Sequence, residues 1–339
     1  MRAIIFLLCA TLLPFCDDAC GEDLSLKAAD GLKWYRGNMH THSLWSDGDN
    51  YPEMIATWYR EHGYDFLVVT DHNILQRGDK WIDVEKNKGG VAAFEKLSEA
   101  FPADWVQTRV EKERKQVRLK TFDEVFERIA KPQEFLLVQG EEITDRYKNL
   151  PIHMCATNAD QLLPPLGGDS VLETMQQNIN AAVSYRERTG QKVLVHLNHP
   201  NYRWGVTAEQ LMKVVGENFF EVYNGHPSVN DSGDETHAST DRIWDIVNTW
   251  RVSKLDLPLM HGLATDDGHK YHVTEPGEGS QPGRGWVMVL TDTLTPDALV
   301  TALEAGRFYS SCGVTLNNVE MQGGQLSVSI AAEDGVTYR

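Results

Sequence analysis

The stretch that decides the fold reads Asn38-Met39-His40-Thr41-His42-Ser43-Leu44-Trp45-Ser46-Asp47-Gly48. In an extended strand, side chains two positions apart point to the same face, so His40 and His42 can bind one metal ion side by side. The Ser-Asp-Gly that follows is typical of a turn, and such a turn can bring Asp47 back over the same face as a third ligand. A His-x-His pair alone is weak evidence, because strands often carry two histidines by chance.

Similar polar groups recur further along the chain, each at or near the end of an apolar run. They are Thr70-Asp71-His72-Asn73, Gly140-Glu141-Glu142-Ile143-Thr144, His153, His199-Pro200 and Asp267-Gly268-His269. In a barrel of parallel strands, the C-terminal ends of the strands meet at one face. The recurrence therefore predicts a metal centre assembled at that face. Imidazole nitrogen and carboxylate oxygen suit Zn, Mn or Fe, and the motifs contain no thiolate.

The composition is ordinary for a soluble globular enzyme, with 339 residues of which 41% are hydrophobic and 24% charged. The net charge of −17 argues against nonspecific binding to nucleic acid or to an anionic membrane surface. We therefore expect a small-molecule substrate. A formally acidic chain can still bind an anionic substrate where bound cations reverse the local field, so an anionic substrate is the expectation.

The first residues have the pattern of a targeting segment. Arg2 precedes an apolar run at residues 3–15, and Ala19-Cys20-Gly21 is typical of a cleavage site between small residues. The apolar run is too short to span a bilayer comfortably. Residues 1–21 are therefore interpreted as a signal peptide that directs export to the periplasm or beyond, with no transmembrane segment in the mature chain. A short buried N-terminal helix is the alternative interpretation.

From residue 34 onward, apolar runs alternate with amphipathic segments, and a repeated β-then-α order predicts a parallel sheet. With about seven such units, and no Gly-x-Gly-x-x-Gly or phosphate-loop signature after any strand, the pattern favours a closed or distorted α/β barrel over an open doubly wound sheet. We expect strands at residues 34–42, 65–70, 134–139, 152–157, 192–197, 219–223, 257–264 and 285–291, and helices at 51–62, 122–131, 170–188, 207–217, 241–252 and 295–306.

Two segments stand outside this alternation. Residues 76–120 form an insertion rich in Lys, Glu and Arg, whose run Glu111-Lys112-Glu113-Arg114-Lys115 is expected to be the solvated face of a helix. Residues 314–339 are expected to be a C-terminal β tail with a hairpin turn at Gln322-Gly323-Gly324. This tail stops within its pattern, which indicates an incomplete segment. The barrel domain is accordingly expected to span residues 22–313.

Taken together, the motifs resemble those of the polymerase and histidinol phosphatase (PHP) family of metal-dependent hydrolases. Each motif is weak alone, and the ordered set carries the resemblance from about Trp34 to His269, with a weaker match through Gly313. The motifs are His40-Thr41-His42, Ser46-Asp47-Gly48, Thr70-Asp71-His72, Gly140-Glu141-Glu142-Ile143, His153, His199-Pro200 and Asp267-Gly268-His269. The resemblance implies a distorted (β/α)7 barrel with three metal ions at the C-terminal ends of its strands.

The resemblance also implies which side chains hold the three ions, all of them histidines or carboxylates. The first ion would be held by His40, His42, Glu142 and Asp267, the second by Glu142, His153 and His199, and the third by Asp47, His72 and His269. A carboxylate that bridges two cations lets them lie roughly 3.5–4 Å apart, where they lower the pKa of a shared water towards about 7. The resulting hydroxide would attack while the ions neutralise charge on a phosphoryl or carbonyl oxygen.

Two of these assignments are choices between neighbouring residues. Glu141 and Glu142 face opposite ways in a strand, and Glu142 is preferred because Gly-x-Glu-Ile-Thr is the form found in the family. His196 competes with His199, and the His-Pro pair favours His199. His196 is then expected inside the barrel, behind the ligands.

Three residues are predicted to take part in catalysis: Glu142, His226 and Arg203. His226 follows a strand end and is the best candidate for contact with the substrate, while Arg203 could either clamp a phosphate or form a surface salt bridge. We expect an exported metal-dependent hydrolase, and above all a phosphoesterase that acts on small organic phosphates. The alternatives are a carbamate, ester or amide hydrolase of the same family and a non-catalytic metal-binding module at the cell surface.

Overall fold

The computed structural model describes residues 5–6, 24–26, 31–273, 275, 278–334 and 336. Most of the predicted signal peptide, residues 1–21, lies outside the described residues. Within the described ranges, no helix is both long enough and apolar enough to cross a membrane.

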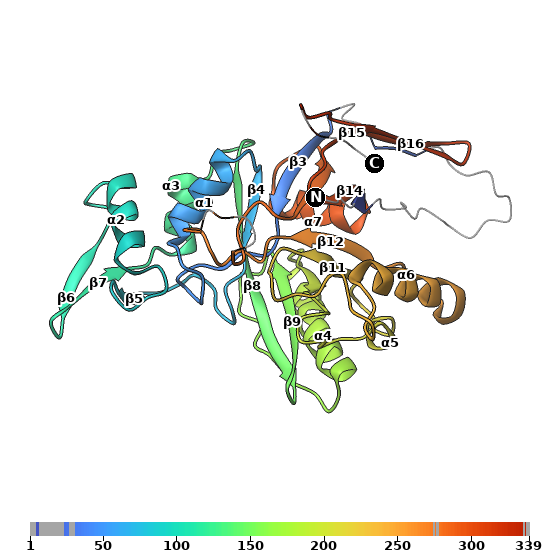
Figure 1. Ribbon diagram of the computed structural model, residues 1–339, viewed down its shortest axis with the longest axis horizontal. Helices are drawn as coiled ribbons and strands as arrows, with labels where there is room; N and C mark the ends of the chain where they lie inside the picture. Colours follow the sequence, from blue (N-terminus) through green and yellow to red (C-terminus); the bar gives the residue numbers. More distant parts are fainter. Residues whose placement is uncertain are drawn as a thin grey trace.

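One large sheet curves into a nearly closed barrel, which confirms the predicted distorted α/β barrel (Figure 1). In spatial order its strands are β1 (Ile5–Phe6), β14 (Phe308–Ser311), β13 (Trp286–Thr291), β3 (Lys33–Asn38), β4 (Phe66–Val69), β8 (Leu136–Tyr147), β9 (Leu150–Thr157), β10 (Leu194–Leu197), β11 (Phe219–Asn224) and β12 (His261–Thr265). The last strand, β12, lies against β13 and β14, so the two ends of the sheet approach each other.

The sheet is only partly parallel. Strands β3, β4 and β8 run parallel, as do β10, β11 and β12. In contrast, β9 is antiparallel to both β8 and β10, and β13 is antiparallel to β3 and β14. The expectation of a wholly parallel sheet is therefore wrong. Only two residues separate β8 from β9, and such a short connection can join antiparallel strands but not parallel ones.

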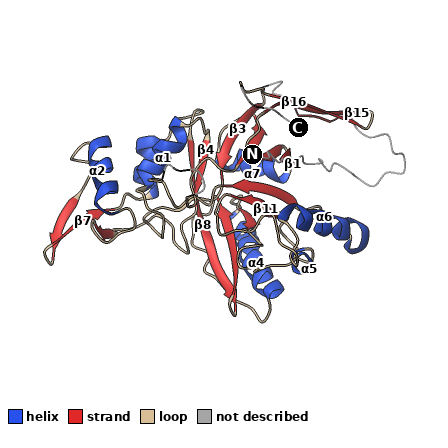
Figure 2. Ribbon diagram, viewed as in Figure 1, coloured by secondary structure: helices blue, strands red, loops and turns tan. Residues whose placement is uncertain are grey.

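Helices cover the outside of this sheet (Figure 2). They are α1 (Pro52–Glu61), α3 (Phe122–Ile129), α4 (Val171–Thr189), α5 (Ala208–Leu211), α6 (Thr240–Trp250) with the π-helical turn η1 (Arg251–Leu255), and α7 (Pro296–Glu304). The ends of α4 follow from local chemistry, because the Ser170 hydroxyl accepts the Glu173 N–H at 3.1 Å and Gly190 closes the helix at φ 74°. The helix expected at 207–217 is much shorter than predicted, since β-branched Val214-Val215 precedes Gly216 at φ 89°.

Alternating side chains divide the core into an interior and an outer layer. On β4, Phe66 and Val68 point into the barrel interior, where they join Leu194 of β10. The intervening Leu67 and Val69 belong to the cluster under α1 and α3. Two-residue periodicity in a strand buried on both faces accounts for this division. Because side chains fill the lower barrel, only its mouth is left for a site.

The insertion is a small β unit rather than a solvated helix. It contains β5 (Trp81–Asp83), α2 (Gly90–Ala100), β6 (Thr108–Glu111) and β7 (Arg114–Arg118), with strand order β5-β7-β6. The charged run that was expected to be helical forms the β6–β7 hairpin, in which Lys112 and Glu113 have φ values of 49° and 66°. Alternation explains the error, because Val117 and Leu119 are fully buried between polar neighbours.

The C-terminal segment is a hairpin, as predicted. Strands β15 (Leu316–Gln322) and β16 (Gln325–Ile330) are joined by Gly323 and Gly324, whose φ values of 54° and 77° suit the tight turn. Strand β2 (Leu24–Leu26) pairs with the other edge of β15. In Figure 1 this hairpin and the insertion lie at opposite ends of the molecule.

Candidate metal centre

All nine predicted metal ligands lie together at the mouth of the barrel. They form four overlapping groups, and within each group the ligand atoms lie within 4.8 Å of one another. The groups are His42, Asp47, His72 and His269; His40, His42 and Glu142; His40, His199 and Asp267; and Glu142, His153 and His199. Motifs that are separate in the sequence thus contribute side chains to a single site.

The two histidines of the opening motif lie just beyond the end of β3 and are fully buried. Asn38 holds this segment by donating to the His40 carbonyl at 2.9 Å, and the His42 N–H donates to the Gly268 carbonyl at 3.0 Å. The Nε2 atoms of His40 and His42 are 3.0 Å apart. Two ring nitrogens that face each other at this distance suit a shared proton or cation between them.

The surroundings shift the pKa values of the two rings in opposite directions. Burial and the neighbouring rings of His269 and His72 lower the pKa of His42 to about 3. Burial alone would also lower the pKa of His40, but the nearby carboxylates, led by Asp267, raise this pKa well above its usual value. In the absence of metal, the site therefore retains protons at some ligand nitrogens, and cation binding would have to displace them.

Glu142 lies at the centre of the ligand groups and is fully buried. Its Oε1 atom is 3.0 Å from His153 Nδ1 and 3.6 Å from His199 Nε2, while Oε2 is 3.6 Å from His42 Nε2 and also contacts His72. Burial raises the pKa of this carboxyl, but the surrounding histidines outweigh burial and hold its pKa well below the usual value. The carboxylate form is therefore favoured.

The antiparallel β8–β9 hairpin explains how Glu142 and His153 meet. The ladder pairs Glu142 with Cys155 and Thr144 with His153, so the two ligand side chains extend from neighbouring positions. Glu141 faces away from the site, and its carboxylate accepts the Leu163 N–H at 2.5 Å. The opposite orientation of the two glutamates agrees with the choice of Glu142 over Glu141.

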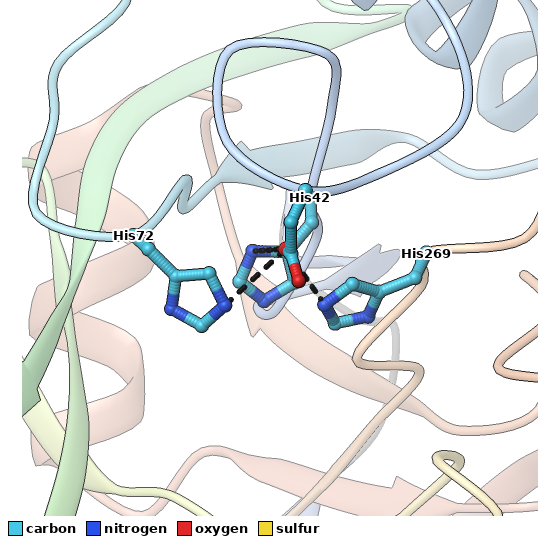
Figure 3. Close-up of side chains that lie close together, drawn as sticks. His42, His72 and His269 are labelled. Carbon is cyan, nitrogen blue, oxygen red and sulfur yellow. Dashed lines mark ion pairs between the residues drawn. The ribbon is translucent and has the colours of Figure 1, made fainter. Parts of the chain in front are cut away.

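At the outer side of the site, His42, His72 and His269 point toward one another (Figure 3). Asp47 Oδ1 is 3.1 Å from His269 Nε2, 3.3 Å from His72 Nε2 and 3.8 Å from His42 Nδ1. The turn that places Asp47 requires glycine at position 48, where any Cβ would lie 2.4 Å from the His42 carbonyl oxygen. Asp47 therefore returns over the histidines, as the Ser-Asp-Gly turn predicts.

Asp71 stabilises this turn from behind. Its carboxylate accepts the Ser43 N–H and hydroxyl, both at 2.8 Å, and the Ser46 hydroxyl at 2.5 Å. Asp71 is in none of the four ligand groups of the described residues. It positions the Asp47 turn.

Asp267 is the carboxylate that connects the inner and outer groups. Its Oδ1 atom is 3.3 Å from His40 Nε2, 3.2 Å from His42 Nε2 and 3.3 Å from His269 Nδ1. Its backbone has a φ of 48°, a left-handed conformation that Asp tolerates better than most residues. His196 lies behind the ligands, as expected, fully buried and 3.5 Å from Glu221 Oε1.

The donor set fits divalent cations. Four buried atoms that converge here make no well-aligned hydrogen bond, although each lies within ion-pair distance of another ligand atom. They are Asp47 Oδ1, Glu142 Oε2, His153 Nδ1 and Asp267 Oδ1. A buried polar atom without a partner is costly, and a buried charge is more so unless it is paired or binds metal. Cations bound among these oxygens and imidazole nitrogens would satisfy them, and the nitrogen–oxygen set suits Zn, Mn or Fe.

A cavity of about 280 Å³ opens over the ligands. His226 lines it, as predicted for a residue that contacts substrate. Arg203 does not: it is exposed, its guanidinium lies 5.4 Å from the centre of the Tyr202 ring, and it is absent from the cavity lining. The interpretation of Arg203 as a phosphate clamp is therefore not supported, because residues 203 and 204 form a left-handed turn on the surface with φ values of 50° and 55°.

Sequence reasoning missed two lysines of the cavity and one buried carboxylate behind it. Lys88 and Lys270 line the cavity, and nothing distinguished them from the other lysines of a charged chain. Glu221 is fully buried, and its Oε1 is 2.7 Å from His40 Nδ1. A signal for Glu221 was present, because it interrupts the apolar run Phe219-Phe220-Glu221-Val222 of a buried strand.

Comparisons with known proteins give structural likeness alone. No family model matches the chain, and no curated protein matches it. A two-domain protein from Bacteroides vulgatus, containing a predicted PHP-like metal-dependent phosphoesterase, is 19% identical with a TM-score of 0.46 over 83% of this chain, which spans 65% of that protein. PsfC from Pseudomonas syringae is 13% identical over 86% of this chain and 94% of its own, with a TM-score of 0.37.

An amidohydrolase from Chromobacterium violaceum, with bound sulfate and no metal, is also similar. It is 13% identical over 72% of this chain and 89% of its own, with a TM-score of 0.33. Identities and TM-scores this low say nothing about activity, for which the evidence lies in the residues of the site.

Proposed function

We propose that this chain is a metal-dependent hydrolase of the PHP type that cleaves phosphoric esters of small organic molecules. One observation carries the proposal: nine histidine and carboxylate side chains from separate motifs converge at the barrel mouth, where carboxylate oxygens of Asp47, Glu142 and Asp267 face ligand nitrogens at ion-pair distances. A site that only stored metal would need neither a central carboxylate surrounded by histidines nor a cavity above it.

The proposed site holds three divalent ions, and its nitrogen–oxygen donor set suits Zn, Mn or Fe. The inner pair would be held by His40, His42, Asp267, His153 and His199 with Glu142 between them, and the outer ion by Asp47, His72 and His269. When bound, such ions lower the pKa of a water molecule towards about 7 and neutralise charge on the phosphoryl group. The chain supplies the orientation of the ligands and a partly enclosed cavity around the reacting group.

His226 is the proposed hydrogen-bond donor to the substrate. Its Nδ1 atom accepts the Ser228 N–H at 3.1 Å, so the neutral ring carries its proton on Nε2. The ring lines the cavity and lies 5.4 Å from the ring of His269, measured between centroids. From this position the Nε2–H group can donate to a phosphoryl oxygen or to the departing oxygen of an ester.

Two cations favour an anionic substrate over a neutral ester. Lys88 Nζ lies 3.2 Å from Asp47 Oδ2, and Lys270 lines the same cavity. Gly279 packs against the stem of Lys270, since a Cβ at position 279 would lie 2.7 Å from its Cγ. Tyr202 and Pro227 contribute carbon surface to the lining. A small organic phosphate matches this combination of charge, carbon surface and volume.

Replacing Lys270 with Met is expected to raise KM for a phosphoric ester about tenfold with a smaller change in kcat. The ammonium group would attract the substrate in the ground and transition states alike, and a loss of about 1.4 kcal/mol corresponds to a factor of ten. Steady-state kinetics on the metal-loaded protein measures the effect. Lys254→Met, an exposed lysine of η1 outside the cavity lining, is the matched control. Equal KM values for both variants would remove Lys270 from substrate binding.

The decisive test of the function is a substrate panel. Protein loaded with zinc or manganese is assayed with a phosphomonoester, a phosphodiester, a carboxylester and a carbamate, and the products are quantified. We expect turnover of a phosphoric ester that disappears on chelation. Hydrolysis of the carboxylester or carbamate alone would instead identify the other hydrolase class. Full metal loading without turnover of any of the four would favour a binding module.

We also propose that the chain is exported and that residues 1–21 are removed. Arg2, the apolar run and the small residues at 19–21 support this. Ile5–Phe6 lies within this segment and pairs with β14, so removal would leave β14 as the edge of the sheet. N-terminal sequencing of the protein secreted by an expressing bacterium should begin near Glu22. An intact Met1 in a cytoplasmic pool would contradict export.

A further inference from the structure

Glu221, on β11, lies behind the ligand groups and is fully buried. From its contacts we infer that Glu221 is a positioning residue, which fixes His40 as the tautomer protonated at Nδ1 and aligns the ligands of the inner ions. This inference rests on the proposed metal binding and goes beyond it, because it assigns a role to a residue that holds no ion.

The hydrogen-bond pattern determines the protonation of Glu221. Its Oε1 atom lies 2.7 Å from His40 Nδ1 and 2.8 Å from the Thr265 hydroxyl. Its Oε2 atom accepts the Asn224 side-chain amide at 2.7 Å and the His199 backbone N–H at 2.8 Å. The Asn224 amide cannot be reversed, because its Oδ1 atom already accepts the His226 N–H at 2.8 Å. Apart from His40, Oε2 thus accepts from two N–H donors and Oε1 from the Thr265 hydroxyl, which suits an acceptor-only carboxylate.

The tautomer of His40 follows from this pattern. If Glu221 accepts at Oε1, then His40 Nδ1 carries the hydrogen, and a cation that displaces the second proton finds the lone pair on Nε2. His40 Nε2 faces the ligand cluster, 3.0 Å from His42 Nε2 and 3.3 Å from Asp267 Oδ1. A carboxylate behind a ligand histidine orients the ring and makes its free nitrogen a better ligand.

The contacts of Glu221 extend to the inner ligands and to none of the outer ones. It contacts the His40 ring and the His199 backbone directly. Through Asn224, whose amide also lies 3.2 Å from Asp267 Oδ2, it reaches a third ligand. None of the contacts of Glu221 involves Asp47, His72 or His269. Loss of Glu221 should therefore weaken the binding of the inner ions and leave the binding of the outer ion unchanged.

Glutamine cannot replace this carboxylate. The Gln amide has one acceptor oxygen and one NH₂ group. In one orientation its NH₂ group faces the Asn224 amide and the His199 N–H, and in the other it faces the Nδ1–H of His40. Glu221→Gln should therefore rotate or displace His40 or the His199 backbone, although the volumes of the two side chains are nearly equal. Glu217→Gln is the matched control. Glu217 is also buried, but it accepts only the backbone N–H groups of Val195 at 3.1 Å and Asn218 at 2.9 Å.

The first experiment uses the wild-type protein. Nitrogen NMR of ¹⁵N-histidine-labelled, zinc-loaded protein reports which ring nitrogen carries hydrogen and which binds metal. We expect His40 to carry hydrogen on Nδ1 and to bind zinc through Nε2. A proton on Nε2 would overturn the inference while zinc binding itself stands. If the wild type binds no zinc, the proposed function and this inference both fail, so the two failures are distinguishable.

The second experiment measures zinc affinity by competition with a chromophoric chelator, together with zinc content. For Glu221→Gln we expect about 10- to 100-fold weaker binding of the inner ions and an unchanged affinity for the outer ion. Glu217→Gln should match the wild type within about twofold. Wild-type affinity at every site in Glu221→Gln, or an equal loss at all sites, would contradict a selective positioning role. If Glu221→Gln does not fold, the tautomer measured in the wild type decides the matter.

Discussion

Replacing Glu142 with Gln is expected to reduce turnover of any accepted substrate by several orders of magnitude and to lower metal content. Glu142 is fully buried and contacts ligand histidines through both carboxylate oxygens. The glutamine amide has no charge to hold two cations close together, and its NH₂ group would face a ligand nitrogen. Lowering the pKa of water from 15.7 towards about 7 is most of what such a site supplies, so this loss should dominate the rate.

Glu141→Gln is the matched control for this change. The two glutamates are neighbours on β8, but Glu141 faces away and accepts the Leu163 N–H. We expect intact metal content and at most about a tenfold loss of rate, the size of an effect transmitted from outside the ligands. Turnover and elemental content are measured for both variants. If Glu141→Gln is the inactive variant, the assignment of the motif is wrong by one residue, and if neither variant loses activity, the bridging role fails.

Removal of metal is expected to lower the melting temperature substantially. Without cations, the carboxylates of Glu142 and Asp267 remain buried among partly protonated histidines, at 0% and 4% exposure. Ligand that binds only the folded state at 1,000 times its Kd stabilises that state by about 4 kcal/mol. For a chain of this size, this corresponds to a rise in Tm of roughly 6 °C on loading.

Thermal unfolding of chelator-treated and zinc-loaded protein measures this difference. Chelator already saturated with zinc is the control for effects of the chelator itself, and return of the metal should restore the higher Tm. Identical melting curves for the two forms, at a free zinc concentration that fills the site, would mean that the cluster gains no stability from cations.

Much of the site could be predicted because its information is local. His40 and His42 are two residues apart, and the Ser46-Asp47-Gly48 turn depends on a glycine that the close approach to the His42 carbonyl requires. Such local patterns can be recognised in a sequence alone. The contact between His153 and Glu142 was harder to predict, because it depends on an antiparallel hairpin that a β-then-α pattern does not lead one to expect.

The residues that were missed depend on contacts distant in sequence. Glu221 contacts His40 across 181 positions, and no local pattern connects the two. In the charged insertion, composition favoured a solvated helix, yet the buried alternation of Val117 and Leu119 produced strands. Arg203 lies outside the cavity lining for a related reason, since proximity to His199 in sequence does not determine which way a side chain points after a left-handed turn.

The insertion leaves the barrel and returns to it at nearly the same point. The Phe122 N–H donates to the Gln76 carbonyl at 2.8 Å, and the Leu119 N–H donates to the Lys80 carbonyl at 2.9 Å. With its base closed in this way, doubling the length of the insertion costs only about 0.6 kcal/mol of loop entropy. The nine proposed ligands all lie outside the insertion, whereas Lys88 belongs to it. A change in the insertion would therefore alter the cavity lining at Lys88 and, with it, the choice of substrate, while the nine proposed ligands stay in place.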